Sequence, residues 1–141
     1  MIKYIEKKLS VEEYLSLRNA VGWKPLTNRQ AGLAVTNSLY MVGVYDDEKL
    51  IGMGRIVGDG GVICYIQDLI ILPEYRKRGI GSVLIKYLKD YVESLTMEGE
   101  EMMLDLMCAK GRENFYIENG FIERPNEKLG PGMISYIKKY S

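Results

Sequence analysis

Arg76-Lys77-Arg78-Gly79-Ile80-Gly81-Ser82 is the stretch of sequence that decides the fold of this chain. It follows an apolar run that ends at Pro73 and leads into a second one that starts at Val83, an order typical of a strand, a glycine loop and a helix. Glycine adopts backbone angles that other residues resist and leaves no side chain in the way. The N–H groups of such a loop, together with the positive end of the following helix, favour a bound phosphate or pyrophosphate.

The alternative interpretation of this stretch is a tight basic turn that enters an ordinary helix. Two nucleotide-binding motifs are excluded by spacing. No Gly-Lys-Ser/Thr ends the loop, so it is not a P-loop, and its single G-x-G is not the dinucleotide fingerprint.

The bulk composition indicates one globular domain, residues 1–141, because a chain of this length can bury a single core. Nineteen basic and nineteen acidic residues cancel, which argues against nucleic acid as a partner. The sequence shows no long apolar span and no signal-peptide pattern near Met1. We therefore expect a cytoplasmic protein without a membrane segment.

The metal-binding residue types are scarce. Histidine is absent, and the two cysteines, Cys64 and Cys108, lack metal-ligand spacing, so we expect no metal site and two free thiols. Without histidine, proton transfer must use Asp, Glu, Tyr, Cys, Lys or water.

Hydrophobic periodicity predicts an α/β fold with a mixed sheet flanked by helices. Ser10 and Glu13 form a capping-box pattern, which places a helix start at Ser10. The expected strands cover 2–6, 40–45, 50–57, 62–72, 102–108 (buried) and 134–140, and the expected helices cover 10–22, 28–34, 81–95 and 112–118. The expected apolar face of the 81–95 helix consists of Val83, Leu84, Tyr87, Leu88, Tyr91 and Val92.

Two polar residues, Gln67 and Asp68, interrupt an otherwise apolar strand. A buried polar group is costly unless it has a partner, so the interruption needs a reason. Strand alternation places the two side chains on opposite faces, and only one of them can face a reacting group. Asp68 is a candidate proton acceptor and Gln67 a candidate substrate contact. The alternative for Asp68 is a turn cap or an ion pair with an arginine.

Two motifs together resemble the GNAT superfamily of N-acetyltransferases. The first is Arg76-x-x-Gly79-x-Gly81, and the second is Phe115-Tyr116-Ile117-Glu118-Asn119-Gly120-Phe121, with the resemblance extending over about residues 40–124. It implies a mostly antiparallel sheet whose two central strands splay apart. Locally, Ile66-Gln67-Asp68-Leu69 is similar to glucosamine-phosphate N-acetyltransferases, with Gln67 where these carry Glu.

The resemblance also implies a cosubstrate, acetyl-CoA, and a set of residues that bind it. The loop would hold the CoA pyrophosphate, and backbone groups of the preceding strand would hold its pantetheine arm. The implied binding residues are Leu69, Ile70, Ile71, Arg76, Lys77, Arg78, Gly79, Gly81 and Ser82.

The implied reaction is direct transfer of the acetyl group to a primary amine of a small molecule. Tyr116 would protonate the leaving CoA thiolate, and the alternative is a core aromatic residue. Trp23, alone in a Gly/Pro loop, and Met133, beside the Gly-Pro-Gly turn, would contact the acceptor; a core plug and a plain turn are the alternatives. The resemblance also implies a homodimer.

Two other functions remain open from the sequence. One is a non-catalytic acyl-CoA sensor on the same fold, which needs the loop but no proton-transfer residue. The other is acetylation of a protein or peptide amine.

Overall fold

The structure is a computed structural model that describes residues 1–140, and the chain divides into two compact units. The first unit is Met1–Leu106 and the second is Met107–Ser141. The first contains β1 (Ile2–Glu6), α1 (Val11–Ala20), α2 (Asn28–Thr36), β2 (Tyr40–Asp46), β3 (Lys49–Gly58), β4 (Ile63–Ile71), the 3-10 helix η1 (Pro73–Tyr75), α3 (Ile80–Leu95) and β5 (Met103–Leu106). The second contains α4 (Glu113–Glu118).

The sheet of the first unit has the strand order β1-β2-β3-β4-β5. The first three pairings are antiparallel and the pairing of β4 with β5 is parallel, which confirms the mixed, mostly antiparallel α/β fold. The parallel pairing ends at Ile66 opposite Leu106, whereas β4 continues to Ile71. The outer edge of β4 is therefore open beyond Ile66, as the expected splay of the central strands requires.

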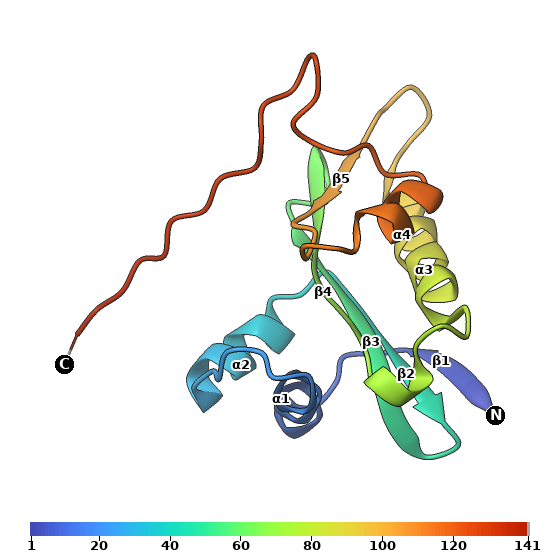
Figure 1. The fold of residues 1–141 in the computed structure, drawn as a ribbon, viewed down its shortest axis with the longest axis vertical. Helices are drawn as coiled ribbons and strands as arrows, with labels where there is room; N and C mark the ends of the chain where they lie inside the picture. Colours follow the sequence, from blue (N-terminus) through green and yellow to red (C-terminus); the bar gives the residue numbers. More distant parts are fainter. Residues whose placement is uncertain (141) are drawn as a thin grey trace. The chain divides into compact units, whose positions relative to one another are not determined.

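Helices cover both faces of this sheet, with α1 and α2 on one face and α3 on the other (Figure 1). The capping box predicted at Ser10 and Glu13 is present, and a second one joins Thr27 to Gln30 at the start of α2. On the α3 face, Gly54 lies so close to Leu88 that a Cβ would be 3.0 Å from a leucine methyl carbon.

The buried face of α3 differs from the expected one at two positions. Val83 is exposed, whereas Ile85 is buried beside Leu84 and Leu88. Tyr87 stacks on Tyr4 and Tyr91 stacks on Tyr40, so these two aromatic residues follow the prediction and pack on the sheet. The helix begins one residue earlier than expected, at Ile80, and this residue is also buried.

A β-bulge interrupts β4 at Gln67. Arg55 of β3 is opposite Asp68, and the next residue of β3, Ile56, is opposite Ile66, which leaves Gln67 without a partner in the register. Arg55 and Ile56 are neighbours in a strand and point to opposite faces. The bulge therefore turns Ile66 toward one face and Asp68 toward the other, although they are two residues apart.

Two expected strands near the C-terminus need correction. The strand predicted over 102–108 is limited to Met103–Leu106, and it is not buried, since Met103 is exposed and the other three residues are half-buried. The strand predicted over 134–140 is wrong: residues 121–140 form no helix or strand. Alternation indicates that a segment can form a strand, but a strand also needs a neighbour to pair with.

Candidate functional site

The loop between β4 and α3 has the geometry that its glycines and basic residues predicted. Lys77 and Gly79 both have positive φ, +63° and +80°, and Gly79 is the N-cap of α3. A Cβ on Gly79 would have no atom within 4 Å, so the space beside the loop is open. The side chains of Arg76 and Arg78 hold the loop, because they donate to Ile71 O at 3.1 Å and to Glu74 O at 2.9 Å.

The N-cap of α3, Gly79, makes no side-chain cap hydrogen bond, and no acidic residue lies in the first turn. The first N–H groups of a helix have no acceptor within the helix, and the helix dipole adds positive potential there. Arg76, Lys77 and Arg78, all exposed, surround this point, so the arrangement can bind a phosphate or pyrophosphate.

The open edge of β4 provides backbone groups next to this loop. The backbone N–H of Leu72 donates to Ile51 O at 2.9 Å. This hydrogen bond shows which residues of β4 direct their backbone groups toward β3. By alternation Ile70 directs its backbone groups toward β3, whereas Leu69 and Ile71 direct theirs toward the open edge. The Ile71 carbonyl already accepts a hydrogen bond from Arg76. The groups best placed to bind a ligand are therefore the N–H groups of Leu69 and Ile71 and the carbonyl of Leu69.

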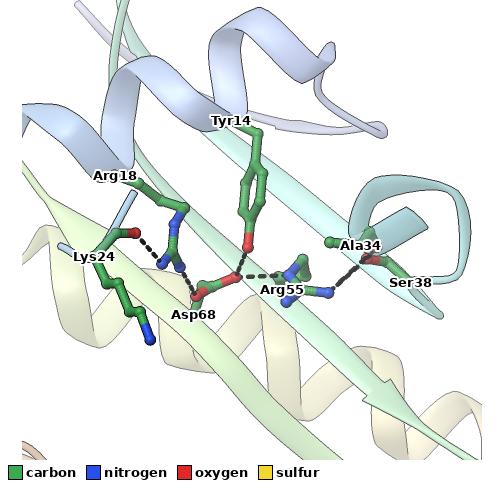
Figure 2. A network of polar contacts seen from close by, with 7 residues as sticks. All are labelled: Tyr14, Arg18, Lys24, Ala34, Ser38, Arg55 and Asp68. Atoms are coloured by element: carbon green, nitrogen blue, oxygen red, sulfur yellow. Dashed lines mark hydrogen bonds and ion pairs between the residues drawn. The ribbon is translucent and has the colours of Figure 1, made fainter. Parts of the chain in front are cut away.

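Asp68 is the centre of a buried polar network beneath α1 (Figure 2). It is 1% exposed and accepts three hydrogen bonds. Tyr14 donates to Oδ2 at 2.7 Å, Arg55 Nε donates to the same oxygen at 2.6 Å, and Arg18 donates to Oδ1 at 3.4 Å. Burial raises the pKa of Tyr14, with the Asp68 carboxylate adding to the rise, so the phenol keeps its proton.

This network joins four elements of the first unit, α1, α2, β3 and β4. Arg55 also donates to Ala34 O and Ser38 Oγ, both at 3.3 Å, and so connects β3 and β4 to α2. Arg18 donates to Lys24 O at 3.0 Å, and its guanidinium lies 5.3 Å from the centre of the Trp23 ring. The network therefore fixes the loop after α1, with Trp23 exposed at its surface.

The geometry supports the ion-pair alternative for Asp68. One carboxylate faces two guanidinium groups, both of its oxygens are engaged, and no face of it is open to solvent. This arrangement anchors α1 to β4, whereas a proton acceptor must reach the proton it removes. The role of Asp68 as a base stays a prediction. Gln67, at the bulge, is exposed.

Sequence reasoning missed the partners of Asp68. Tyr14 and Arg18 are one helical turn apart and so share a face of α1. Arg55 interrupts an apolar strand, as Asp68 does, and a buried charge needs a counter-charge. These two signals together could have identified the pair.

Tyr116 belongs to the second unit, on α4. Its ring makes edge contacts with Phe115 and Phe121, at centroid distances of 5.0 and 5.7 Å. Burial raises the pKa of the Tyr116 phenol, with Cys108 adding to the rise, so the phenol keeps its proton at neutral pH. Met133 lies in the same unit and is almost fully exposed.

A hollow of about 320 Å³ in the first unit lies away from the loop. It follows the C-terminal half of α3 from Lys89 to Thr96, and Lys89 is ten residues from Gly79, about 15 Å along the helix. A phosphate site at a helix N-terminus is formed by surface N–H groups and needs no deep cavity. We therefore take the loop, and not this hollow, as the candidate site.

Residues 1–140 contain no cluster of three or more His, Cys, Asp or Glu side chains arranged to hold a metal ion. Cys64 is buried and Cys108 exposed, and both are free thiols. Within the same range, no helix is both long and apolar enough to cross a bilayer.

Comparison with known proteins identifies relatives of this chain. The model of the acetyltransferase (GNAT) family matches residues 7–121. An uncharacterized N-acetyltransferase, ycf52-like, from Prochlorococcus marinus is 32% identical over 123 residues, which are 84% of this chain and 66% of the relative.

Two solved bacterial structures are similar over nearly their whole length. A protein of unknown function from Staphylococcus aureus, described as a probable acetyltransferase, has a TM-score of 0.84 and 32% identity, covering 99% of this chain and 100% of its own. A GNAT family acetyltransferase from Streptococcus pneumoniae has a TM-score of 0.82 and 31% identity, with the same coverage.

More distant structures share the fold alone. Glucosamine-6-phosphate N-acetyltransferase from Arabidopsis thaliana has a TM-score of 0.71 at 13% identity, covering 96% of this chain and 99% of its own. An aminoglycoside N-acetyltransferase in complex with CoA has a TM-score of 0.69 at 15% identity, covering 98% of this chain and 95% of its own.

Proposed function

This chain belongs to the acetyltransferase (GNAT) family, and we propose that it transfers the acetyl group of acetyl-CoA directly to a primary amine of a small molecule. The observation that carries the proposal is the N-terminus of α3, whose N-cap Gly79 makes no side-chain cap hydrogen bond and lies in a basic loop beside the open edge of β4.

The residues of this region fit the chemistry of CoA. Its pyrophosphate needs N–H donors and positive charge, which the first turn of α3 and the basic loop supply. Its pantetheine arm carries amides, which pair with backbone groups such as those of Leu69 and Ile71 at the edge of β4. When bound, acetyl-CoA supplies a thioester whose carbonyl carbon an amine attacks, and the CoA thiolate leaves.

Tyr116 holds the proton in this proposal. Its phenol stays protonated at neutral pH because its pKa is raised, and Oη can donate that proton to a leaving thiolate. Asp68 acts as an anchor that keeps α1 and the Trp23 loop on β4 through Arg18 and Arg55. Proximity and orientation of the two reactants supply most of the rate enhancement.

The acceptor is proposed from the surface that this anchor fixes. Trp23 and Gln67 are exposed residues of the first unit, and an exposed aromatic ring on a fixed loop is a typical ligand contact. We assign Met133 the same role from its exposure beside the Gly-Pro-Gly turn. Two distant structures with this fold are named for glucosamine-6-phosphate and an aminoglycoside, which favours a small primary amine, whereas another is named for the alanine of a ribosomal protein.

Calorimetric titration of the purified chain with acetyl-CoA tests the loop, with Gly79→Trp and Gly99→Trp as a matched pair. Both glycines have positive φ, +80° and +84°, and both have open space around the missing Cβ, so the two variants carry the same backbone strain. We expect Gly79→Trp to lose affinity at least tenfold and Gly99→Trp to bind as the parent chain does. Equal affinity of all three would refute the site.

Release of free thiol over a panel of primary amines tests the reaction. Thiol release with at least one small amine would support the proposal. Binding of acetyl-CoA without thiol release on any small amine, but with release on a peptide amine, would make the acceptor a protein. Binding without release on either class would make the chain a sensor.

A further inference from the structure

Tyr75 lies at the end of η1, directly before the basic loop, and it is buried although its neighbours Glu74 and Arg76 are exposed. Its side chain is 9% exposed. The backbone N–H of Tyr75 donates to Leu72 O at 2.9 Å, which closes the single turn of η1. The ring is therefore attached to a fixed turn and not to the loop itself.

The hydroxyl of Tyr75 joins η1 to β2. It donates to Asp46 Oδ2 at 2.7 Å, and Asp46 is the last residue of β2, so η1 lies beside the end of that strand (Figure 1). This hydrogen bond lowers the pKa of the Asp46 carboxyl and raises the pKa of the Tyr75 phenol. At neutral pH a protonated donor therefore faces a charged acceptor, which makes a strong hydrogen bond and fixes the orientation of the ring.

The side chain of Arg78 lies on the ring that this bond fixes. Its guanidinium carbon is 4.9 Å from the centre of the Tyr75 ring, a distance at which a cation is attracted to an aromatic face. Arg78 Nη2 also donates to Glu74 O at 2.9 Å. An unrestrained arginine samples many rotamers, and ordering it when a ligand binds lowers the affinity. Both contacts therefore order Arg78 before any ligand arrives.

A second and weaker link joins η1 to the same hairpin. Lys49 Nζ lies 3.6 Å from Glu74 Oε1 and 5.6 Å from the centre of the Tyr75 ring, and Lys49 is the first residue of β3. Both members of this ion pair are more than half exposed, so water screens their attraction. The buried Tyr75 is therefore the principal connection between the β2–β3 hairpin and the basic loop.

We propose that Tyr75 is a positioning residue for acetyl-CoA: bound to Asp46, its ring holds Arg78 beside the N-terminus of α3, where the pyrophosphate binds. The inference rests on the proposed function, because it takes the basic loop as the pyrophosphate site. Arg78 directly precedes Gly79, the N-cap of α3. A guanidinium carries five N–H donors, so the bond to Glu74 O leaves donors for a phosphate oxygen. Tyr75 acts through Arg78 and not on the reacting atoms.

Tyr45 is a matched control for Tyr75. It is buried to the same degree, 8% exposed, and its hydroxyl also donates to a carboxylate, Glu13 Oε2 at 3.1 Å. A cation also lies over its ring, with Lys7 Nζ 5.5 Å from the centroid. These partners belong to the start of α1 and the segment before it, and not to the basic loop. A loss of stability alone should therefore be similar in both sets of variants.

Calorimetric titration with acetyl-CoA, with urea denaturation of the same samples, separates positioning from support of the fold. We expect Tyr75→Leu to weaken binding about five- to tenfold, because it removes the ring under Arg78. Tyr75→Phe keeps the ring and loses only Asp46, so we expect a loss of about twofold. Tyr45→Leu and Tyr45→Phe should bind as the parent chain does. In turnover, Tyr75→Leu should raise the KM for acetyl-CoA and leave kcat unchanged.

A double variant tests whether Tyr75 acts through Arg78. Arg78→Met alone should weaken the binding of acetyl-CoA, since it removes a cation from the loop. If Tyr75 works only by holding that cation, adding Tyr75→Leu to Arg78→Met costs no further affinity. Two groups that act independently would instead give losses that multiply.

The remaining outcomes separate this inference from the proposed function. A parent chain that does not bind acetyl-CoA overturns the proposed function. A parent chain that binds, with equal affinity in Tyr75→Leu or an equal loss in Tyr45→Leu, overturns the positioning role alone, as do losses that multiply in the double variant. Where denaturation shows that Tyr75→Leu does not fold, Tyr75→Phe decides, and affinity equal to the parent's overturns the role.

Discussion

Replacing Asp68 by Asn removes the negative charge from the buried network and leaves its shape almost unchanged. Two guanidinium groups, those of Arg55 and Arg18, then share a buried site without an anion. Removal of one partner of a buried ion pair typically destabilises a protein by about 3–5 kcal/mol. Because Asn keeps one oxygen acceptor, we expect the lower end, about 3 kcal/mol. For a chain of this length that lowers Tm by about 10 °C.

Urea denaturation followed by circular dichroism measures this loss as a change in the free energy of unfolding. Asp90→Asn is the matched control, because Asp90 pairs with Lys86 at 2.7 Å on the exposed surface of α3. Such a pair contributes about 0.5 kcal/mol or less. A second variant, Asp68→Asn with Arg18→Met, removes the surplus cation and should recover about 1 kcal/mol or more of the loss.

Two results would refute the anchoring role of Asp68. One is a loss as small as that of Asp90→Asn. The other is a full loss of acetyl transfer in an Asp68→Asn variant that is as stable as the parent chain. That result would support a role of Asp68 as a proton acceptor.

Three further predictions follow from local geometry. Tyr116→Phe should lower kcat by about 100-fold or more with unchanged affinity for acetyl-CoA. Burial raises the pKa of this phenol above its ordinary value of 10.0, so ionisation of Tyr116 should not lower the kcat of the parent chain between pH 7 and 9. A decline of kcat in that range that is absent from Tyr116→Phe would contradict this prediction. Gly52→Ala should destabilise the protein by about 2 kcal/mol or more, because its Cβ would lie 2.6 Å from the backbone oxygen of Ile70. Gly32→Ala should stabilise it by about 0.5–1 kcal/mol, because the space around Gly32 in α2 is open. Thermal melts in which Gly52→Ala is as stable as Gly32→Ala would contradict the register of the sheet. Ser10→Ala should lower the free energy of unfolding by about 1 kcal/mol, measured by denaturation, because it removes the helix cap. The hydrogen bond from the Ser10 N–H lowers the pKa of Glu13. The parent chain should therefore be more stable than Glu13→Gln above about pH 4.5, and this difference should disappear as the pH falls below that value.

Local signals in the sequence predicted most of the first unit. The capping box at Ser10, the alternation of the strands and the glycine loop each depend on residues within a few positions of one another. For this reason α1, the antiparallel strands and the start of α3 were predicted to within one or two residues. The basic loop was identified in the same way, since Arg76, Gly79 and Gly81 are neighbours in the chain.

Features that depend on distant pairing could not be predicted. The bulge at Gln67 exists only relative to β3, and the partners of Asp68 come from positions 14, 18 and 55. The wrong strand at 134–140 shows the same limit, because alternation alone cannot identify a neighbouring strand. Asp68 itself was identified as exceptional by its position in an apolar strand, while its role depends on contacts that no local pattern contains.

The extra residue at Gln67 also divides β4 into two halves whose alternation is out of phase. Before Gln67 the even-numbered residues face α3, and after it the even-numbered residues face α1 and α2. Deletion of Gln67 would bring the two halves into phase and rotate every later side chain of β4 to the opposite face of the sheet. The carboxylate would then meet the leucines of α3. The spacing between the bulge and the glycine loop is therefore a fixed dimension of this fold.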